Sequence, residues 1–124
     1  MEHKIVVVDD DVKVVILLEK VLKKLGFEVF SADDGNKALE LVKKERPDLL
    51  ISDMLIPGLH GIELSKTIKQ DPELKDTIVV LMTAVYGKRE YTSNDMDSMA
   101  DKYIDKPIDV KNLINLISSL KDWS

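Results

Sequence analysis

Short apolar segments alternate with longer amphipathic segments along the chain. The apolar segments are rich in β-branched residues and have the length of strands, and the segments between them have the length of helices. This alternation is typical of βαβ units, in which successive strands run parallel. The predicted strands span residues 5–8, 28–32, 49–52, 78–82 and 103–104.

Two of these strands are apolar on both faces. Residues 5–8 read Ile-Val-Val-Val and residues 78–81 read Ile-Val-Val-Leu, without the alternation of a strand that has one face in water. Strands of this kind lie in the middle of a parallel sheet that helices cover on both sides. The sequence therefore predicts a three-layer α/β domain.

Four amphipathic segments are predicted to be helices, spanning residues 12–25, 36–45, 62–69 and 110–120. Gly26 stands where it can stop the first helix, and the second and third end shortly before Pro47 and Pro72. Asp109 is a suitable N-cap for the fourth. Residues 86–100 are polar and lack a clean apolar stripe, so we expect a helix there that is short or mobile.

The composition narrows the class of protein. The net charge of -5 argues against a surface that neutralises nucleic-acid phosphates, and no apolar run approaches the roughly 18 residues that span a membrane. No cysteine is available for a disulfide or a thiolate metal site, which fits a cytoplasmic location. We expect one domain covering residues 1–124, without direct nucleic-acid binding or membrane insertion.

Polar groups follow the predicted strands. Because the carboxyl ends of parallel strands meet at the same edge of a sheet, these groups should converge. They are Asp9, Asp10 and Asp11 after the first strand, Asp53 at the end of the third, Thr83 at the end of the fourth, and Asp105 and Lys106 after the fifth. Carboxylates, a hydroxyl and an ammonium group are thus predicted to share one site.

A cluster of this composition suits a magnesium ion and a phosphoryl group. Carboxylates that lie together repel one another unless a cation neutralises them, and oxygen ligands without histidine or cysteine favour a hard ion. Mg²⁺ commonly shares one or two carboxylates with a phosphate oxygen, so the substrate should carry phosphate. Aspartate is an established phosphoryl acceptor, and Asp53 would have the metal, Thr83 and Lys106 as neighbours.

Each of these residues also has a purely structural explanation. An aspartate at a strand end often caps the next helix, a threonine can fill a strand, and a lysine can be a solvated loop charge. Taken singly, these explanations are at least as good as the functional one. Taken jointly, their placement at the correct strand ends of one topology favours a functional site.

Four motifs occur in the order of a known family. They are VVVDDD at residues 6–11, SDMLIPGLHG at residues 52–61, LMTA at residues 81–84 and YIDKP at residues 103–107. Through them the chain resembles the receiver domains of two-component response regulators, of the stand-alone chemotaxis or sporulation type. The resemblance implies a doubly wound, flavodoxin-like sheet of five parallel strands in the order 2-1-3-4-5, with helices on both faces.

The resemblance also implies a role for each acidic residue. Asp53 would be the phosphoacceptor, and Asp10 and Asp53 would ligate Mg²⁺ together with the backbone carbonyl of Leu55. Asp9 would hold the metal through water, and Asp11 would start the following helix. Such a domain is not an enzyme that turns over an external substrate, because it promotes only its own phosphorylation and slow dephosphorylation.

Three further residues complete the implied switch. Lys106 would pair with the phosphoryl oxygens, Thr83 would hydrogen-bond the new phosphate, and Tyr103 would follow it inward. The family usually has a cis peptide bond before Pro107, which could aim the Lys106 ammonium at the pocket. The expected function is a phosphorylation-dependent change of conformation that modulates a downstream protein.

Some positions depart from the family's common pattern. Leu55 and Val85, two residues beyond Asp53 and Thr83, offer no group to orient a hydrolytic water, so we predict a relatively long-lived phosphoryl group. His60 stands where the family often has aspartate. Met99 stands where the family often has glycine, and the segment before it is unusually polar. These two features leave open which surface of the domain contacts the downstream protein.

The expected phosphodonor is a histidine kinase or a histidine phosphotransfer protein. The helix predicted at residues 12–25 carries more apolar surface than a core requires, and in the family this helix and the loop after the Lys-Pro pair meet the donor. The candidate docking residues are Val14, Leu17, Pro107 and Ile108. Scattered surface apolar residues explain the same pattern equally well. We expect a monomer or a weak, phosphorylation-dependent dimer.

Three other functions fit parts of this pattern. A flavodoxin-like electron carrier shares the topology, but the aspartates after the first strand would repel the FMN phosphate. An aspartate-based phosphatase usually has a second aspartate two residues past the nucleophile, where this chain has Leu55. A receiver-like module that is not phosphorylated is the remaining alternative, weakened because no site residue is missing.

Two histidines and the single tryptophan are not assigned to the site. His3 and His60 are isolated from the acidic cluster and are given no role. Trp123 either packs back on the sheet or begins a further domain, and packing at the terminus is the simpler interpretation.

Overall fold

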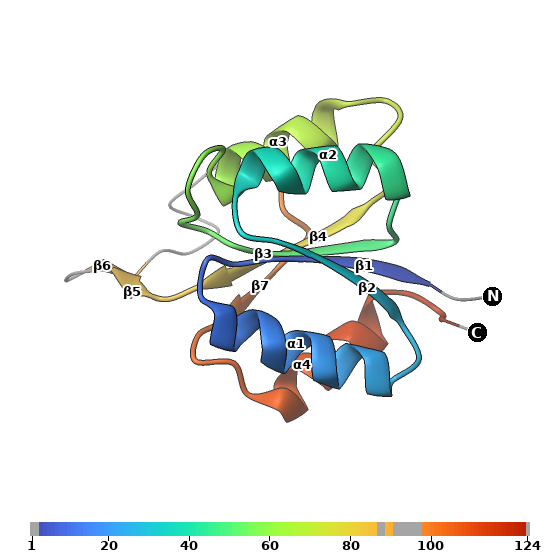
Figure 1. Cartoon of the computed structure of the whole chain (residues 1–124), viewed down its shortest axis with the longest axis vertical. Helices are drawn as coiled ribbons and strands as arrows, with labels where there is room; N and C mark the ends of the chain where they lie inside the picture. Colours follow the sequence, from blue (N-terminus) through green and yellow to red (C-terminus); the bar gives the residue numbers. More distant parts are fainter. Residues whose placement is uncertain (1–2, 87–88, 91–97, 124) are drawn as a thin grey trace.

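The computed structural model describes residues 3–86, 89–90 and 98–123, and there a central sheet lies between two layers of helices (Figure 1). Strands and helices alternate along the chain as far as β4. In chain order the elements are β1 (Lys4–Val8), α1 (Val12–Lys24), β2 (Glu28–Ala32), α2 (Gly35–Glu45), β3 (Leu49–Asp53), α3 (Gly61–Gln70), β4 (Ile78–Thr83), β5 (Val85–Tyr86), β6 (Arg89–Glu90), β7 (Lys102–Asp105) and α4 (Val110–Leu120).

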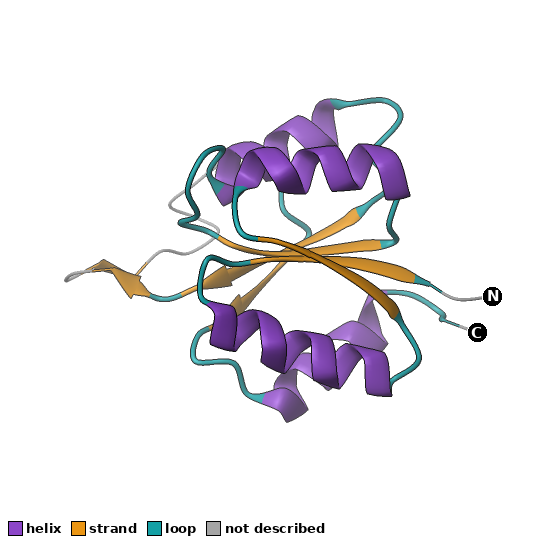
Figure 2. Cartoon of the chain, in the orientation of Figure 1, coloured by secondary structure: helices purple, strands orange, loops and turns teal. Residues whose placement is uncertain are grey.

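The main sheet is parallel and has the strand order β2-β1-β3-β4-β7. Counting these five strands in chain order, this is the doubly wound order 2-1-3-4-5. Helices α2 and α3 cover one face of the sheet, and α1 and α4 cover the other (Figure 2). The predicted three-layer α/β architecture is confirmed.

Successive side chains of the central strands point into two separate cores. The core under α2 and α3 includes Val6, Leu50, Val79, Val42 and Ile68. The core under α1 and α4 includes Val7, Ile51, Val80, Leu22 and Leu113. Because a central strand is buried on both faces, consecutive positions along its middle are apolar. The uninterrupted apolar runs of the sequence have this cause.

Aspartate side chains begin three of the helices. Those of Asp11, Asp34 and Asp109 each accept a hydrogen bond from a backbone N–H of the first turn, at 3.0, 2.8 and 2.9 Å. Gly26 follows α1 with φ of 98°, a conformation that favours glycine, and it ends the helix as predicted. None of the helices in the described part of the chain is long and apolar enough to cross a membrane.

The expectation of a helix within residues 86–100 was wrong for the residues described there. Val85–Tyr86 and Arg89–Glu90 are paired antiparallel strands, and residues 98–100 have no regular secondary structure. The rest of the segment lies outside the described residues. The hairpin projects at the end of the sheet opposite the two termini (Figure 1). A short helix without an apolar stripe gains little from packing, so extended backbone can replace it.

Trp123 packs back onto the domain. Its ring makes edge-to-face contacts with Phe27 and His3, with ring centroids 5.0 and 5.1 Å apart. Its indole nitrogen donates to the carbonyl oxygen of Ile117 at 2.8 Å. The simpler interpretation of Trp123, packing at the terminus, is confirmed. His3 lies beside it and also faces Asp48 at 3.4 Å.

Candidate functional site

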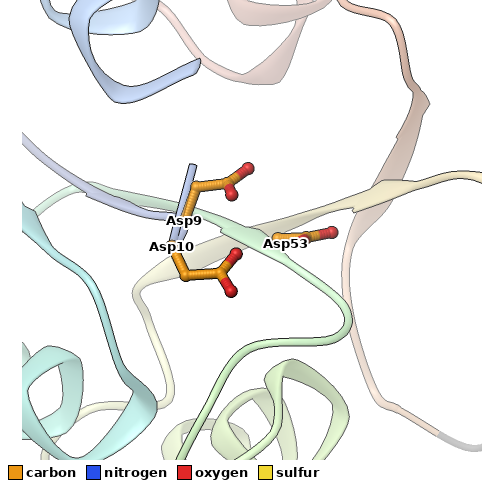
Figure 3. A group of neighbouring side chains, drawn as sticks. All are labelled: Asp9, Asp10 and Asp53. Carbon is orange, nitrogen blue, oxygen red and sulfur yellow. The ribbon is translucent and has the colours of Figure 1, made fainter. Parts of the chain in front are cut away.

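Three carboxylates meet at the carboxyl ends of β1 and β3 (Figure 3). Asp9 and Asp10 follow β1, and Asp53 is the last residue of β3. One oxygen of each carboxylate lies within 4.8 Å of the others. Asp9 and Asp53 are buried, with 1% and 5% of their surface exposed, whereas Asp10 is exposed.

The strand register brings these carboxylates together. Val8 lies beside Ser52 in the parallel pair of β1 and β3, so Asp9 and Asp53 come next on neighbouring strands at the same level. The side chain of Asp11 turns to cap α1, and its backbone N–H donates to Oδ1 of Asp9 at 2.9 Å. Of three consecutive aspartates, two therefore face the site and one begins a helix.

Lys106 supplies positive charge to the buried carboxylates. Its Nζ atom lies 2.9 Å from Oδ2 of Asp9 and 3.4 Å from Oδ2 of Asp53. Burial alone would lower the pKa of Lys106, but the hydrogen bond to Asp9 and the charges of Asp53 and Asp9 outweigh it and raise the pKa above its ordinary value. Lys106 therefore stays charged. The peptide bond between Lys106 and Pro107 is cis, as the resemblance implies.

The donor set fits a hard divalent cation. The three clustered side chains offer only carboxylate oxygens, and Mg²⁺ prefers oxygen ligands. Two of the three carboxylates are buried, where their mutual repulsion is strong. Leu55 stands two residues beyond β3 with an exposed side chain, and the part assigned to its backbone carbonyl stays a prediction.

Gly61 is a site residue that sequence reasoning missed. A Cβ atom added to it would lie 2.3 Å from the backbone oxygen of Asp53 and 3.0 Å from Cα of Met54. Its N–H donates to the Met54 carbonyl at 3.1 Å, which holds the start of α3 against the end of β3. The motif at residues 52–61 ends at this glycine, but a close approach of two backbones is visible only in three dimensions.

Thr83 and Tyr103 lie on the two strands beyond β3. Thr83 is 4% exposed, and its hydroxyl donates to Oδ1 of Asp105 at 3.2 Å. Tyr103 is half-buried against the core under α2 and α3, and its hydroxyl makes a short hydrogen bond with Oγ of Ser98. The sequence indicated neither Asp105 nor Ser98 as a partner. The register of β4 against β7 brings Thr83 to Asp105, and the path of residues 98–103 brings Tyr103 to Ser98.

The family described as the response regulator receiver domain matches residues 5–118 of the chain. This range holds every residue of the site. The chain is a response regulator receiver domain. Receiver domains act as phosphorylation-dependent switches of two-component systems: they take a phosphoryl group onto an aspartate with Mg²⁺ and change conformation.

Individual relatives agree with this assignment. The receiver domain is 40% identical to sporulation initiation phosphotransferase F of Bacillus subtilis (strain 168) over 113 residues, which are 91% of this chain and 89% of that protein. It resembles the chemotaxis protein CheY4 of Vibrio cholerae, with a TM-score of 0.85 and 25% identity over 98% of this chain and all of that chain.

One solved structure of the same fold contains a metal. It is the receiver domain of a sensor histidine kinase from Pseudomonas aeruginosa PAO1, with a magnesium ion coordinated in its active-site cleft. Its TM-score is 0.82 and its identity 22%, over 95% of this chain and 96% of that chain. At this identity the likeness concerns the fold.

The four predicted docking residues of the receiver domain differ in exposure. Leu17 is 37% exposed and Pro107 is exposed, whereas Val14 and Ile108 are half-buried against the core under α1 and α4. Helix α1 also exposes Ile16. Apolar surface beyond the needs of the core is therefore present on α1, and a docking role for it stays a prediction.

The positions that depart from the family's pattern differ in exposure and in backbone conformation. Leu55 is 42% exposed. His60 is exposed and precedes α3 as its N-cap residue, without a side-chain capping bond. Met99 is 44% exposed and has φ of 62°, the conformation that a glycine adopts easily. The side chain of Val85 lies outside the described residues.

Proposed function

We propose that Asp53 is the phosphoryl acceptor of this receiver domain. The observation that carries the proposal is a buried carboxylate at the end of β3 whose Oδ2 lies 3.4 Å from the Lys106 ammonium. Both oxygens of the neighbouring Asp9 already accept hydrogen bonds, from the Asp11 N–H and from Lys106. These two bonds hold the Asp9 carboxylate in place beside Lys106, which suits its proposed role next to the metal.

Asp10 and Asp53 would ligate Mg²⁺ together with the backbone carbonyl of Leu55, and Asp9 would hold it through water. The clustering of carboxylate oxygens within 4.8 Å supports this assignment. When bound, Mg²⁺ supplies positive charge that offsets the carboxylates and the incoming phosphoryl oxygens.

The phosphoryl group would come from a phosphohistidine of a histidine kinase or a histidine phosphotransfer protein. An oxygen of Asp53 attacks phosphorus and forms the new P–O bond, while the P–N bond breaks and its electron pair stays on the donor imidazole. Lys106 stabilises negative charge on the transferred group. The domain thus promotes its own phosphorylation and the slow hydrolysis of the acyl phosphate, without turning over an external substrate.

The conformational change would begin at Thr83 and then involve Tyr103. A new phosphoryl group on Asp53 offers oxygens that accept the Thr83 hydroxyl, and movement of that side chain makes room for Tyr103. The ring of Tyr103 already packs on the core, so a modest displacement moves it from half-buried to buried. The surface around β7 then differs between the two states and is available to a downstream protein.

The donor would dock on α1 and on the loop after the cis peptide bond, through Val14, Leu17, Pro107 and Ile108. Exposed apolar surface on α1 near the acidic site supports this choice. A monomer, or a weak dimer that forms on phosphorylation, is proposed, and a cytoplasmic location stays a prediction.

Incubation with Mg²⁺ and a small acyl phosphate, followed by intact-mass measurement, tests the function. We expect one phosphoryl adduct on the wild-type domain and none on Asp53→Ala. Asp48→Asn is the matched control, because Asp48 directly precedes β3 and lies at the end of that strand opposite Asp53. This variant should be phosphorylated normally. Asp105→Asn would be unsuitable as a control, because Asp105 lies in the site.

Other outcomes of the same experiment would redirect the assignment. Sustained release of phosphate would indicate a phosphatase, and a bound flavin would indicate an electron carrier. A wild-type domain that takes up no phosphoryl group from either the small donor or a phosphorylated histidine protein would indicate an interaction module.

A further inference from the structure

In the unphosphorylated domain, the hydroxyl of Thr83 hydrogen-bonds a residue that has no part in the proposed phosphorylation switch. Its Oγ1 atom donates to Oδ1 of Asp105 at 3.2 Å and lies 3.5 Å from the carbonyl oxygen of Ile104. Thr83 and Asp105 are direct cross-strand neighbours on β4 and β7. In this structure the hydroxyl is therefore directed at β7.

We propose that Asp105 is a positioning residue that holds the Thr83 hydroxyl against β7 in the unphosphorylated domain and thereby opposes the switch. The inference rests on the proposed function, in which Thr83 hydrogen-bonds the phosphoryl group on Asp53. A hydroxyl has a single hydrogen to donate. It cannot serve the Asp105 carboxylate and a phosphoryl oxygen together, so the two acceptors compete for it.

The backbone around this pair is held in place, which leaves the side chain as the moving part. The N–H of Lys106 donates to the carbonyl oxygen of Thr83 at 2.6 Å, just beyond the paired residues. Threonine is branched at Cβ and occupies only a few χ1 positions. A rotation about χ1 can release Asp105 without separating β4 from β7. Loss of the Asp105 carboxylate should therefore change the resting population and not the sheet.

The balance between the two acceptors follows from charge and exposure. Asp105 carries one negative charge and is exposed to water, which weakens its hold on the hydroxyl. A phosphoryl group carries about 1.5 to 2 negative charges at neutral pH and would form in a buried site. After phosphorylation, the Thr83 hydroxyl therefore donates to the phosphoryl group. Before phosphorylation, Asp105 accepts it and keeps the domain in its resting state.

Asp105→Ala removes the competing acceptor and gives the first test. We expect autophosphorylation by a small acyl phosphate with Mg²⁺ to become about threefold to tenfold faster, the range that a partly exposed charged hydrogen bond allows. In a sample labelled at threonine methyl groups, the Thr83 NMR signal, assigned from its loss in Thr83→Val, should move toward its position in the phosphorylated wild type before any donor is added.

Two further variants separate the hydrogen bond from other effects. Asp105→Asn keeps an oxygen acceptor and should restore much of the resting position of Thr83. In a Thr83→Val background, where no hydroxyl remains, Asp105→Ala should change the phosphorylation rate no further. Urea unfolding of Asp105→Ala verifies that the domain stays folded.

Four outcomes would overturn the inference. An unmoved Thr83 signal in Asp105→Ala would show that Asp105 does not position the hydroxyl. A rate increase of equal size in the Thr83→Val background would assign the effect to the lost charge beside Lys106. A wild-type domain that is not phosphorylated at all would overturn the proposed function and this role together, whereas normal phosphorylation unaffected by Asp105→Ala would overturn this role alone.

Discussion

The ammonium nitrogen of Lys106 lies 2.9 Å from Oδ2 of Asp9, although the two residues are 97 positions apart in the chain. The Asp9 side chain is fully buried and that of Lys106 is 19% exposed. Part of the negative charge of the site is thus balanced before a phosphoryl group arrives. Under the proposed function, Lys106 would pair with Asp9 in the resting domain and with the phosphoryl oxygens after transfer.

Replacement of Lys106 by methionine should destabilise the domain. Without Mg²⁺ we expect the free energy of unfolding to fall by about 1–3 kcal/mol, because the buried Asp9 and Asp53 lose their cation. Mg²⁺ should restore more stability to Lys106→Met than it adds to the wild type. Urea denaturation with and without Mg²⁺ measures both effects.

A second lysine provides the control for this measurement. Lys121 pairs with Asp48 at 3.3 Å, and its side chain is 35% exposed. Lys121→Met should change the free energy of unfolding by less than about 1 kcal/mol. Equal effects of the two substitutions would contradict the idea that Lys106 neutralises a buried site.

From neutral pH upward, the stabilisation from Lys106 should depend on pH only at the alkaline end. The pKa of Lys106 in the folded domain is raised above its model-peptide value of 10.5, so folding favours the charged form. Its contribution is complete below the unfolded pKa and disappears as the pH rises through the folded pKa. The difference in unfolding free energy between wild type and Lys106→Met should stay constant from about pH 7 to pH 10 and shrink above it. A difference that already shrinks between pH 7 and 9 would contradict the raised pKa.

Gly61→Ala should damage both stability and phosphorylation. The added Cβ would meet the backbone of Asp53 and Met54, which cannot move as a side chain can, so we expect a loss of about 1–3 kcal/mol and slower phosphoryl uptake. Gly26→Ala is the control: its Cβ would meet no atom within 4 Å, and its φ of 98° makes strain the only cost. That variant should lose stability yet be phosphorylated at the normal rate. Normal uptake by Gly61→Ala would show that Gly61 does not position Asp53.

Leu55→Asn should shorten the life of the phosphoryl group. An amide near the acyl phosphate can orient a hydrolytic water, which the apolar Leu55 cannot, so hydrolysis should become at least about threefold faster. Because Leu55 is 42% exposed, the substitution leaves the cores intact. Leu25→Asn, at a leucine that is 46% exposed at the end of α1, should leave the half-life unchanged. The half-life is followed by intact mass after removal of the donor, and a wild-type half-life of seconds would refute the prediction of slow hydrolysis.

Met99→Gly should stabilise the domain. Met99 has φ of 62°, which is strained for any residue with a Cβ, and glycine relieves the strain while adding freedom to the unfolded chain. The relief of backbone strain is larger than the effect on the unfolded chain. We therefore expect a gain of roughly 0.5 kcal/mol in the free energy of unfolding. Thermal and urea unfolding measure it. A loss of stability would mean that the exposed methionine side chain makes contacts that outweigh the strain.

Much of this protein follows from its sequence because the physical signals are local or periodic. Apolar runs such as residues 5–8 require burial on both faces, and Asp109 caps α4 through contacts within one turn. The direction of parallel strands places Asp9, Asp10 and Asp53 at one edge before any coordinate is known. The wrong expectation for the described residues 86, 89–90 and 98–100 has the same origin, because a segment without an apolar stripe carries no signal that separates helix from extended backbone.

Only the tertiary structure decided which of these groups touch. The family resemblance already placed Asp11 at the start of a helix, but only the path of the chain pairs Asp9 with Lys106. The partner of Thr83 depends on how β4 and β7 are aligned. Glycine is needed at position 61 because the chain folds back there and brings this residue against the backbone carbonyl of Asp53, eight residues earlier. Contacts of this kind join residues distant in sequence through register and close packing, and no pattern along the chain encodes them.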